Sequence, residues 1–178
     1  MRTQQALIST AWLIFGSLMA AGEPSSERIV SKYSSTARAK SISFQETGEE
    51  GDPGFHGLFP GYGGYKLEFL GGDERSWINI KFGKQTANLY SATMEAADGT
   101  FPRKANDMVE WRGVEKNGRF TPYAIIYRIE AGNDETRKTH TRLVVIKLVR
   151  ERSTVIGHAE GANEDADAKQ IADRARPH

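Results

Sequence analysis

The chain has 178 residues, no cysteine, and 24 basic against 23 acidic residues. Disulfide bonds are therefore excluded, and the charge balance gives no sign of a nucleic-acid partner. The length fits one domain whose stability comes from packing and hydrogen bonds.

The first 22 residues have the features of a secretory signal peptide. Arg2 is their only charge, and it precedes the apolar run Ala6 to Ala20, which is too short to span a bilayer comfortably. Small residues at the end of this stretch predict cleavage before Glu23; cleavage two residues earlier and an uncleaved anchor helix are the alternatives. We therefore expect a periplasmic or secreted protein with no membrane span after removal of residues 1–22.

Residues 23–40 are polar and serine-rich, which predicts a flexible leader. The folded domain is expected to occupy residues 41–178. It begins with an alternating strand, Ser41 to Gln45, and continues into an acidic loop, Glu46 to Gly54.

The stretch Phe59 to Phe69, FPGYGGYKLEF, raises the question of whether its glycines cradle a phosphate or turn the chain. A phosphate loop needs a strand before it and a helix after it. Here the alternating run YKLEF follows, and Ser76 to Phe82 alternates again, so the glycines are predicted to form a turn that leads into a hairpin. Residues 83–106 give no clear pattern, and their structure stays open.

Residues 107–130 contain two strand-like runs around Asn117-Gly118, a strong hairpin motif. A three-residue loop with Gly118 in a bulge sets Trp111 opposite Tyr123, so that apolar side chains share one face. This register is expected because a two-residue loop sets Glu110 and Arg112 opposite apolar positions.

The C-terminal third ends the sheet and begins a helix. Thr141 to Val149 is the most strand-like run in the chain, and Ser153 to Ala159 follows as the last strand. Alanine and isoleucine spacing then predicts a helix over residues 163–176 with Asn163 as its N-cap. The expected fold is α+β: a curved antiparallel sheet of six or seven strands with one C-terminal helix packed on it.

Several segments in sequence order resemble landmarks of an uncharacterised family of small exported proteobacterial proteins. They include PGYGGYKLEF, DMVEWRG and RLVVIKL, and the resemblance spans residues 57–175. Members of that family carry cysteines just before the GY turn and at the start of the last strand, where this chain has Phe59 or Pro60 and Thr154. The resemblance implies export and a domain of this shape, and it brings no activity or catalytic residue.

No catalytic residue is assigned from the sequence, and no metal or cofactor is expected. The four histidines lack short ligand spacing, and no G-x-S-x-G elbow occurs. Carboxylates of a glycoside hydrolase could come from the acidic residues Glu46, Glu49, Glu50, Asp52 and Glu110. Solvated charge is the ordinary explanation for the first four.

The face opposite Trp111 offers the one candidate binding surface. Glu110 and Arg112 project from it, and Tyr62 is expected at its edge. The alternatives are a solvated sheet face with weak ion pairs and a polar recognition surface. The sequence thus favours a non-enzymatic binding or inhibitor-like module that meets an unknown protein or envelope component. A carboxylate-dependent hydrolase of envelope polymers and a structural envelope protein are the alternatives.

Overall fold

The computed structural model describes residues 26–49, 52–99, 101–133 and 138–177. The predicted signal peptide, residues 1–22, lies outside them. Within the described part of the chain, no helix is both long and apolar enough to cross a membrane.

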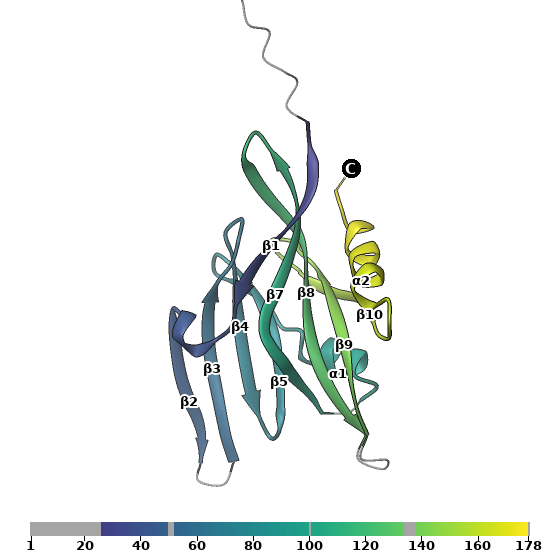
Figure 1. Cartoon of the computed structure of the whole chain (residues 1–178). Helices are drawn as coiled ribbons and strands as arrows, with labels where there is room; N and C mark the ends of the chain where they lie inside the picture. The colour runs from purple at the N-terminus through teal and green to yellow at the C-terminus, as the bar shows by residue number, and fades with distance from the viewer. Residues whose placement is uncertain (1–25, 50–51, 100, 134–137, 178) are drawn as a thin grey trace, which may run out of the picture.

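Two antiparallel sheets of five strands each form the body of the protein (Figure 1). The meander sheet has its strands in sequence order: β2 (Ser43–Glu49), β3 (Asp52–Pro60), β4 (Tyr65–Gly72), β5 (Arg75–Phe82) and β6 (Gln85–Ala87). The helix-backed sheet has the order β1 (Arg28–Ser35), β7 (Pro102–Lys116), β8 (Arg119–Asn133), β9 (Lys138–Lys147) and β10 (Thr154–Ala159).

The prediction of an α+β antiparallel fold is confirmed, but the single sheet of six or seven strands is wrong. Each sheet has one strongly apolar face, and the two faces bury each other. Phe59, Leu67 and Ile78 of the meander sheet share this core with Trp111 and Ile125 of the helix-backed sheet, and all five are fully buried. Strand alternation alone does not show that the hydrophobic faces belong to two sheets.

The C-terminal helix α2 (Glu164–Asp173) packs on the outer face of the helix-backed sheet, as predicted (Figure 1). Its buried Ala168 and Ala172 meet a second core that includes Ile126 and Val145. These small side chains let the helix lie close to the sheet. Asn163 occupies the N-cap position, although its side chain makes no capping hydrogen bond.

The predicted leader of residues 23–40 is wrong for most of its described part. Strand β1 pairs with β7 over its whole length, and η1 (Arg38–Lys40) is a short 3-10 helix. A serine-rich strand is tolerated here because β1 is an edge strand, and its polar side chains find partners: Trp111 Nε1 donates to Ser34 Oγ at 2.8 Å. The predicted acidic loop, Glu46 to Gly54, is also strand in its described part, because residues 46–49 of β2 pair with residues 52–55 of β3.

Both glycine turns form, although one hairpin has a different register from the prediction. Gly63 and Gly64 have positive φ values of 64° and 87° between β3 and β4, which confirms the turn. The β7–β8 hairpin has a two-residue loop, and a bulge at Tyr123 sets Trp111 opposite Ile125. The bulge restores the apolar face that a longer loop was expected to provide.

The segment left open, residues 83–106, contains β6, the short helix α1 (Tyr90–Ala96) and the beginning of β7. Helix α1 buries Thr93 and Ala96, and it stands where the chain crosses from one sheet to the other. The first residues of β7 then run beside the meander sheet: the Lys104 amide donates to Ser76 Oγ at 2.7 Å. This contact places the start of β7 at the mouth of a cleft.

Candidate ligand-binding cleft

A cleft of about 400 Å³ opens between the meander sheet and the N-terminal part of β7. Its floor consists of three phenylalanine rings, Phe44, Phe55 and Phe69, one from each of β2, β3 and β4. The Phe44 and Phe55 rings stack with their centroids 5.8 Å apart. The Phe55 and Phe69 rings are tilted relative to each other, and their centroids are 4.8 Å apart. The floor is therefore a continuous aromatic surface.

Glycines in the strands let these rings lie flat against the sheet. A Cβ atom at Gly71 would stand 2.2 Å from the Phe55 ring, and one at Gly57 would stand 3.0 Å from the Phe44 ring. The aromatic rings thus occupy space that any other residue at position 71 would fill.

Lys104 of β7 closes part of the cleft with a positive charge. Its Nζ lies 4.4 Å from the centre of the Phe69 ring, a cation–π contact. The same ammonium donates to Thr36 O at 3.4 Å, to Thr36 Oγ1 at 3.2 Å and to Asp107 Oδ1. It is therefore held in place above the floor.

Three arginines complete a rim of charged side chains, and two of them are paired with carboxylates outside the lining: Arg38 with Glu46 and Arg75 with Asp73. Arg38, Arg75 and Arg103 line the cleft together with Lys104, against the two carboxylates of Glu74 and Asp107. Arg103 Nη2 lies 3.3 Å from Glu74 Oε2, and both side chains are largely exposed. Exposed pairs of this kind are weak and exchange partners easily.

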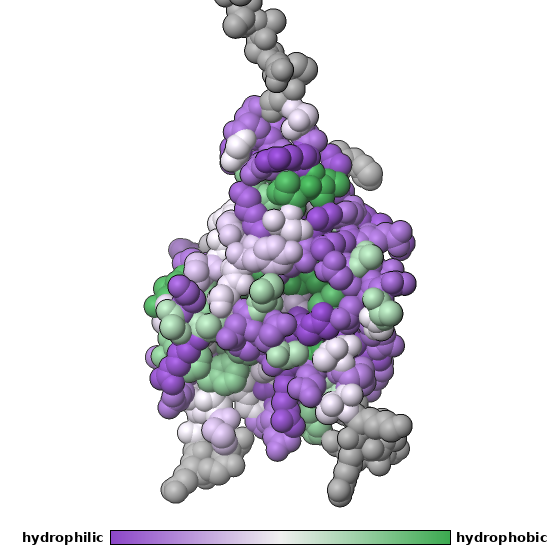
Figure 2. Space-filling model, viewed as in Figure 1, coloured by the Kyte–Doolittle hydropathy of each residue, from purple (hydrophilic) through white to green (hydrophobic). Residues whose placement is uncertain are grey.

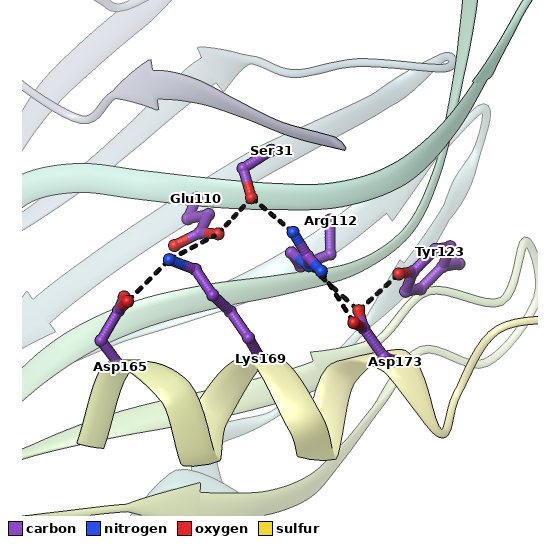
Figure 3. Close-up of polar contacts among 7 residues, drawn as sticks. All are labelled: Ser31, Glu110, Arg112, Tyr123, Asp165, Lys169 and Asp173. Carbon is purple, nitrogen blue, oxygen red and sulfur yellow. Dashed lines mark hydrogen bonds and ion pairs between the residues drawn. The ribbon is translucent and has the colours of Figure 1, made fainter. Parts of the chain in front are cut away.

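Glu110 and Arg112, two residues of the predicted recognition surface, lie together on the outer face of β7 (Figure 3). They are not solvated as a bare sheet face would be, because α2 covers them: Glu110 is only 8% exposed. Ser31 of β1 joins them, since its Oγ donates to Glu110 and accepts from Arg112 Nη1 at 2.9 Å. Lys169 of α2 approaches Glu110 Oε1 at 3.9 Å.

Asp173 of α2 binds Arg112 through two hydrogen bonds, at 3.0 Å to Nε and 2.7 Å to Nη2 (Figure 3). The Tyr123 hydroxyl donates to the same carboxylate at 2.6 Å. Burial acts to raise the pKa of Asp173, but the hydrogen bonds from Arg112 and Tyr123 outweigh it and lower the pKa. Burial, together with the bond to Asp173, raises the pKa of Tyr123. The arrangement is a charged clamp that holds α2 on the sheet.

Tyr62, the third predicted residue, lies apart from Glu110 and Arg112. Its ring packs edge-on against Trp111, which faces the core between the sheets, and its hydroxyl donates to Tyr33 O at 3.0 Å. The structure thus brings Glu110 and Arg112 together beneath α2 and leaves Tyr62 on the other side of β7.

Other histidine and carboxylate side chains that the sequence offered as candidates make ordinary ion pairs and hydrogen bonds. His56 Nε2 lies 3.1 Å from Glu68 Oε1, and Glu46 Oε1 accepts from Arg38 at 2.6 Å. Glu50 lies outside the described residues. In the ranges that the structure describes, no three His, Asp or Glu side chains are grouped so that they could hold a metal ion.

Sequence reasoning missed the cleft. The sequence pattern predicts Phe44 and Phe69 only as strand residues, and it gives no structure for the segment that contains Lys104. Figure 2 shows a mainly hydrophilic face with hydrophobic residues gathered in small areas. A cleft lined by three phenylalanine rings is therefore a candidate site.

The chain matches no protein-family model, no curated protein and no solved structure. Its resemblance to small exported proteobacterial proteins stays a prediction.

Proposed function

We propose that this protein is a non-enzymatic binding module of the cell envelope, exported by residues 1–22 and periplasmic or secreted. The observation that carries the proposal is the cleft between the sheets, with its aromatic floor and its rim of charged side chains. A concave apolar site with a few convergent polar groups is the usual form of a ligand pocket.

The carboxylates support binding more than hydrolysis. A glycoside hydrolase needs one carboxyl group with a raised pKa to act as the acid. In the described part of the chain, the pKa values of the carboxyl groups of Asp98, Glu115, Glu160 and Asp173 are lowered. Glu74 and Asp107 in the cleft each contact a cation. These groups are suited to ion pairing.

The test is capture of bound material from an envelope extract. The immobilised protein is incubated with the extract, washed and eluted, and the eluate is identified by mass spectrometry. We expect the wild type to retain a defined species and Phe44→Arg, which puts a charge on the floor, to lose it. Ile42→Arg is the matched control, because Ile42 is 54% exposed and does not line the cleft.

Melting temperatures of the variants show whether each one folds. Equal retention by wild type and a folded Phe44→Arg protein would contradict binding in the cleft. Loss of the species from the double variant Glu110→Ala, Arg112→Ala, with Phe44→Arg unaffected, would instead place recognition on the outer face of β7.

A further inference from the structure

We propose that the cleft binds the anion of a medium-chain fatty acid, with the chain on the phenylalanine floor and the carboxylate at Arg103 on the rim. This inference rests on the proposed function, because it names the ligand class of the same cleft. Three features of the cleft support the fatty acid anion: its phenylalanine floor, its charged rim and its volume.

The floor selects an apolar group. The rings of Phe44, Phe55 and Phe69 carry no hydrogen-bonding atom, and their contacts join them into one surface. A polar peptide placed here would lose hydrogen bonds to water without replacement, at a cost of about 1–3 kcal/mol for each group. An alkyl chain has no hydrogen bonds to lose, and it gains the transfer of its methylenes out of water.

The rim can pair with a negative head group. Four cations line the cleft, and each of them contacts a carboxylate: Arg38 with Glu46, Arg75 with Asp73, Arg103 with Glu74 and Lys104 with Asp107. Arg103 is the side chain best able to bind a ligand carboxylate, because its salt bridge to Glu74 is 3.3 Å long and largely exposed, so the carboxylate can take the place of Glu74. A guanidinium presents two parallel N–H groups that match a carboxylate. Lys104 adds a fixed charge directly above the floor.

The volume selects one chain. About 400 Å³ is near the lower end of the range of ligand pockets, about 300–1,000 Å³. One medium-length chain suits this space better than the two chains of a diacyl lipid. A lysophospholipid has one chain but a larger head group, which needs more room at the rim.

The experiment is isothermal titration calorimetry of the purified protein with four probes below their critical micelle concentrations: dodecanoate, dodecanol, dodecyltrimethylammonium and lauroyl lysophosphatidylglycerol. We expect one molecule of dodecanoate to bind to each chain. Its affinity should be about tenfold higher than that of dodecanol, because one charge-assisted hydrogen bond contributes about this much. The cationic probe is expected to bind most weakly, and the lysophospholipid less tightly than dodecanoate.

Charge-neutralising variants give opposite signs. Arg103→Gln is expected to weaken dodecanoate binding about threefold to fivefold, as for an exposed charge, and Glu74→Gln to strengthen it by a similar factor. Neither change is expected to alter dodecanol binding. Arg28→Gln is the control: Arg28 is also an exposed arginine paired with a glutamate, and it does not line the cleft.

The preference for an anionic head group would be overturned if dodecanol bound as tightly as dodecanoate. It would also be overturned if Arg103→Gln and Glu74→Gln bound dodecanoate with the same affinity. Tighter binding of the lysophospholipid would overturn the free fatty acid as the occupant. Failure of all four probes would overturn the inference as a whole. In each case the capture experiment with Phe44→Arg still decides separately whether the cleft binds something else.

Discussion

The two faces of β7 show how differently one strand can be buried. On the inner face, Val109 and Trp111 pack among apolar side chains of both sheets and are at most 1% exposed. On the outer face, Glu110 and Arg112 are also withdrawn from solvent, yet they sit among polar groups supplied by β1 and α2. The same strand is therefore held by dispersion on one side and by charge on the other.

Polar alternation along a strand therefore does not by itself mean a solvated face. A helix can cover charged strand residues when it brings the complementary charges, as α2 does with Lys169 and Asp173 (Figure 3). Such a network stabilises only when its members are satisfied, and removal of one leaves another buried without a partner. The inner face should therefore tolerate no cavity, and the outer face no unpaired charge.

The largest expected effect is on the inner face. Trp111→Ala removes a fully buried ring and leaves a cavity, so the free energy of unfolding should fall by about 3–5 kcal/mol in urea denaturation. Trp77→Ala is the matched control, since Trp77 is only partly buried on the other side of the meander sheet, and its loss should be clearly smaller. Equal losses would show that the core between the sheets is not the main source of stability.

The outer face should show strong coupling between its charges. Arg112→Met alone leaves Asp173 without its cation, and Asp173→Leu alone leaves Arg112 without its carboxylate. Each change should therefore lower the free energy of unfolding by about 2–3 kcal/mol. The double variant should lose less than the sum of the two, because it leaves neither charge behind. Additive losses would indicate that the clamp contributes no interaction of its own.

Acid should loosen the same face. The pKa of Asp173 is lowered in the folded protein, as are those of Asp98 and Glu160, whose first cause is a hydrogen bond from Arg142. A lowered pKa gives stability that is present above the unfolded value, about 4 for carboxyl groups, and is lost as the pH falls through the folded value. Thermal melts should therefore be flat near neutral pH and decline below about pH 4, with a shallower decline in Asp173→Asn. An unchanged acid limb in that variant would contradict the role of Asp173.

The smallest expected effect concerns Tyr62. Its hydroxyl makes one exposed hydrogen bond to Tyr33 O, while its ring keeps its contacts with Trp111 and Phe120. Tyr62→Phe should thus change the free energy of unfolding by about 0.5–1 kcal/mol or less. A loss as large as that of Arg112→Met would mean that this bond ties β1 to the turn more strongly than its exposure indicates.

The local pattern of the sequence predicts individual elements well. The alternation in Tyr65–Phe69 and the alanine spacing around Ala168 and Ala172 led to the observed strand and helix. Alternation says which residues share a face, but not which faces meet, so the division into two sheets was not predictable. Strand β1 escaped notice because an edge strand needs few apolar residues.

The candidate cleft was beyond the sequence for a related reason. Its floor joins Phe44, Phe55 and Phe69 from three strands, and its charge comes from Lys104 on a fourth, so the site exists only after the two sheets have come together. Glu110 and Arg112 were rightly placed on one face of β7, but their partners on α2 lie more than fifty positions away in the chain.

The most direct test of the account is an NMR measurement of contacts between the protein and bound dodecanoate. Intermolecular NOEs are recorded between the methylene protons of the ligand and the aromatic protons of the protein. We expect NOEs to the rings of Phe44, Phe55 and Phe69 in the cleft. NOEs confined to Tyr33 or Tyr123, on the other side of the helix-backed sheet, would contradict it.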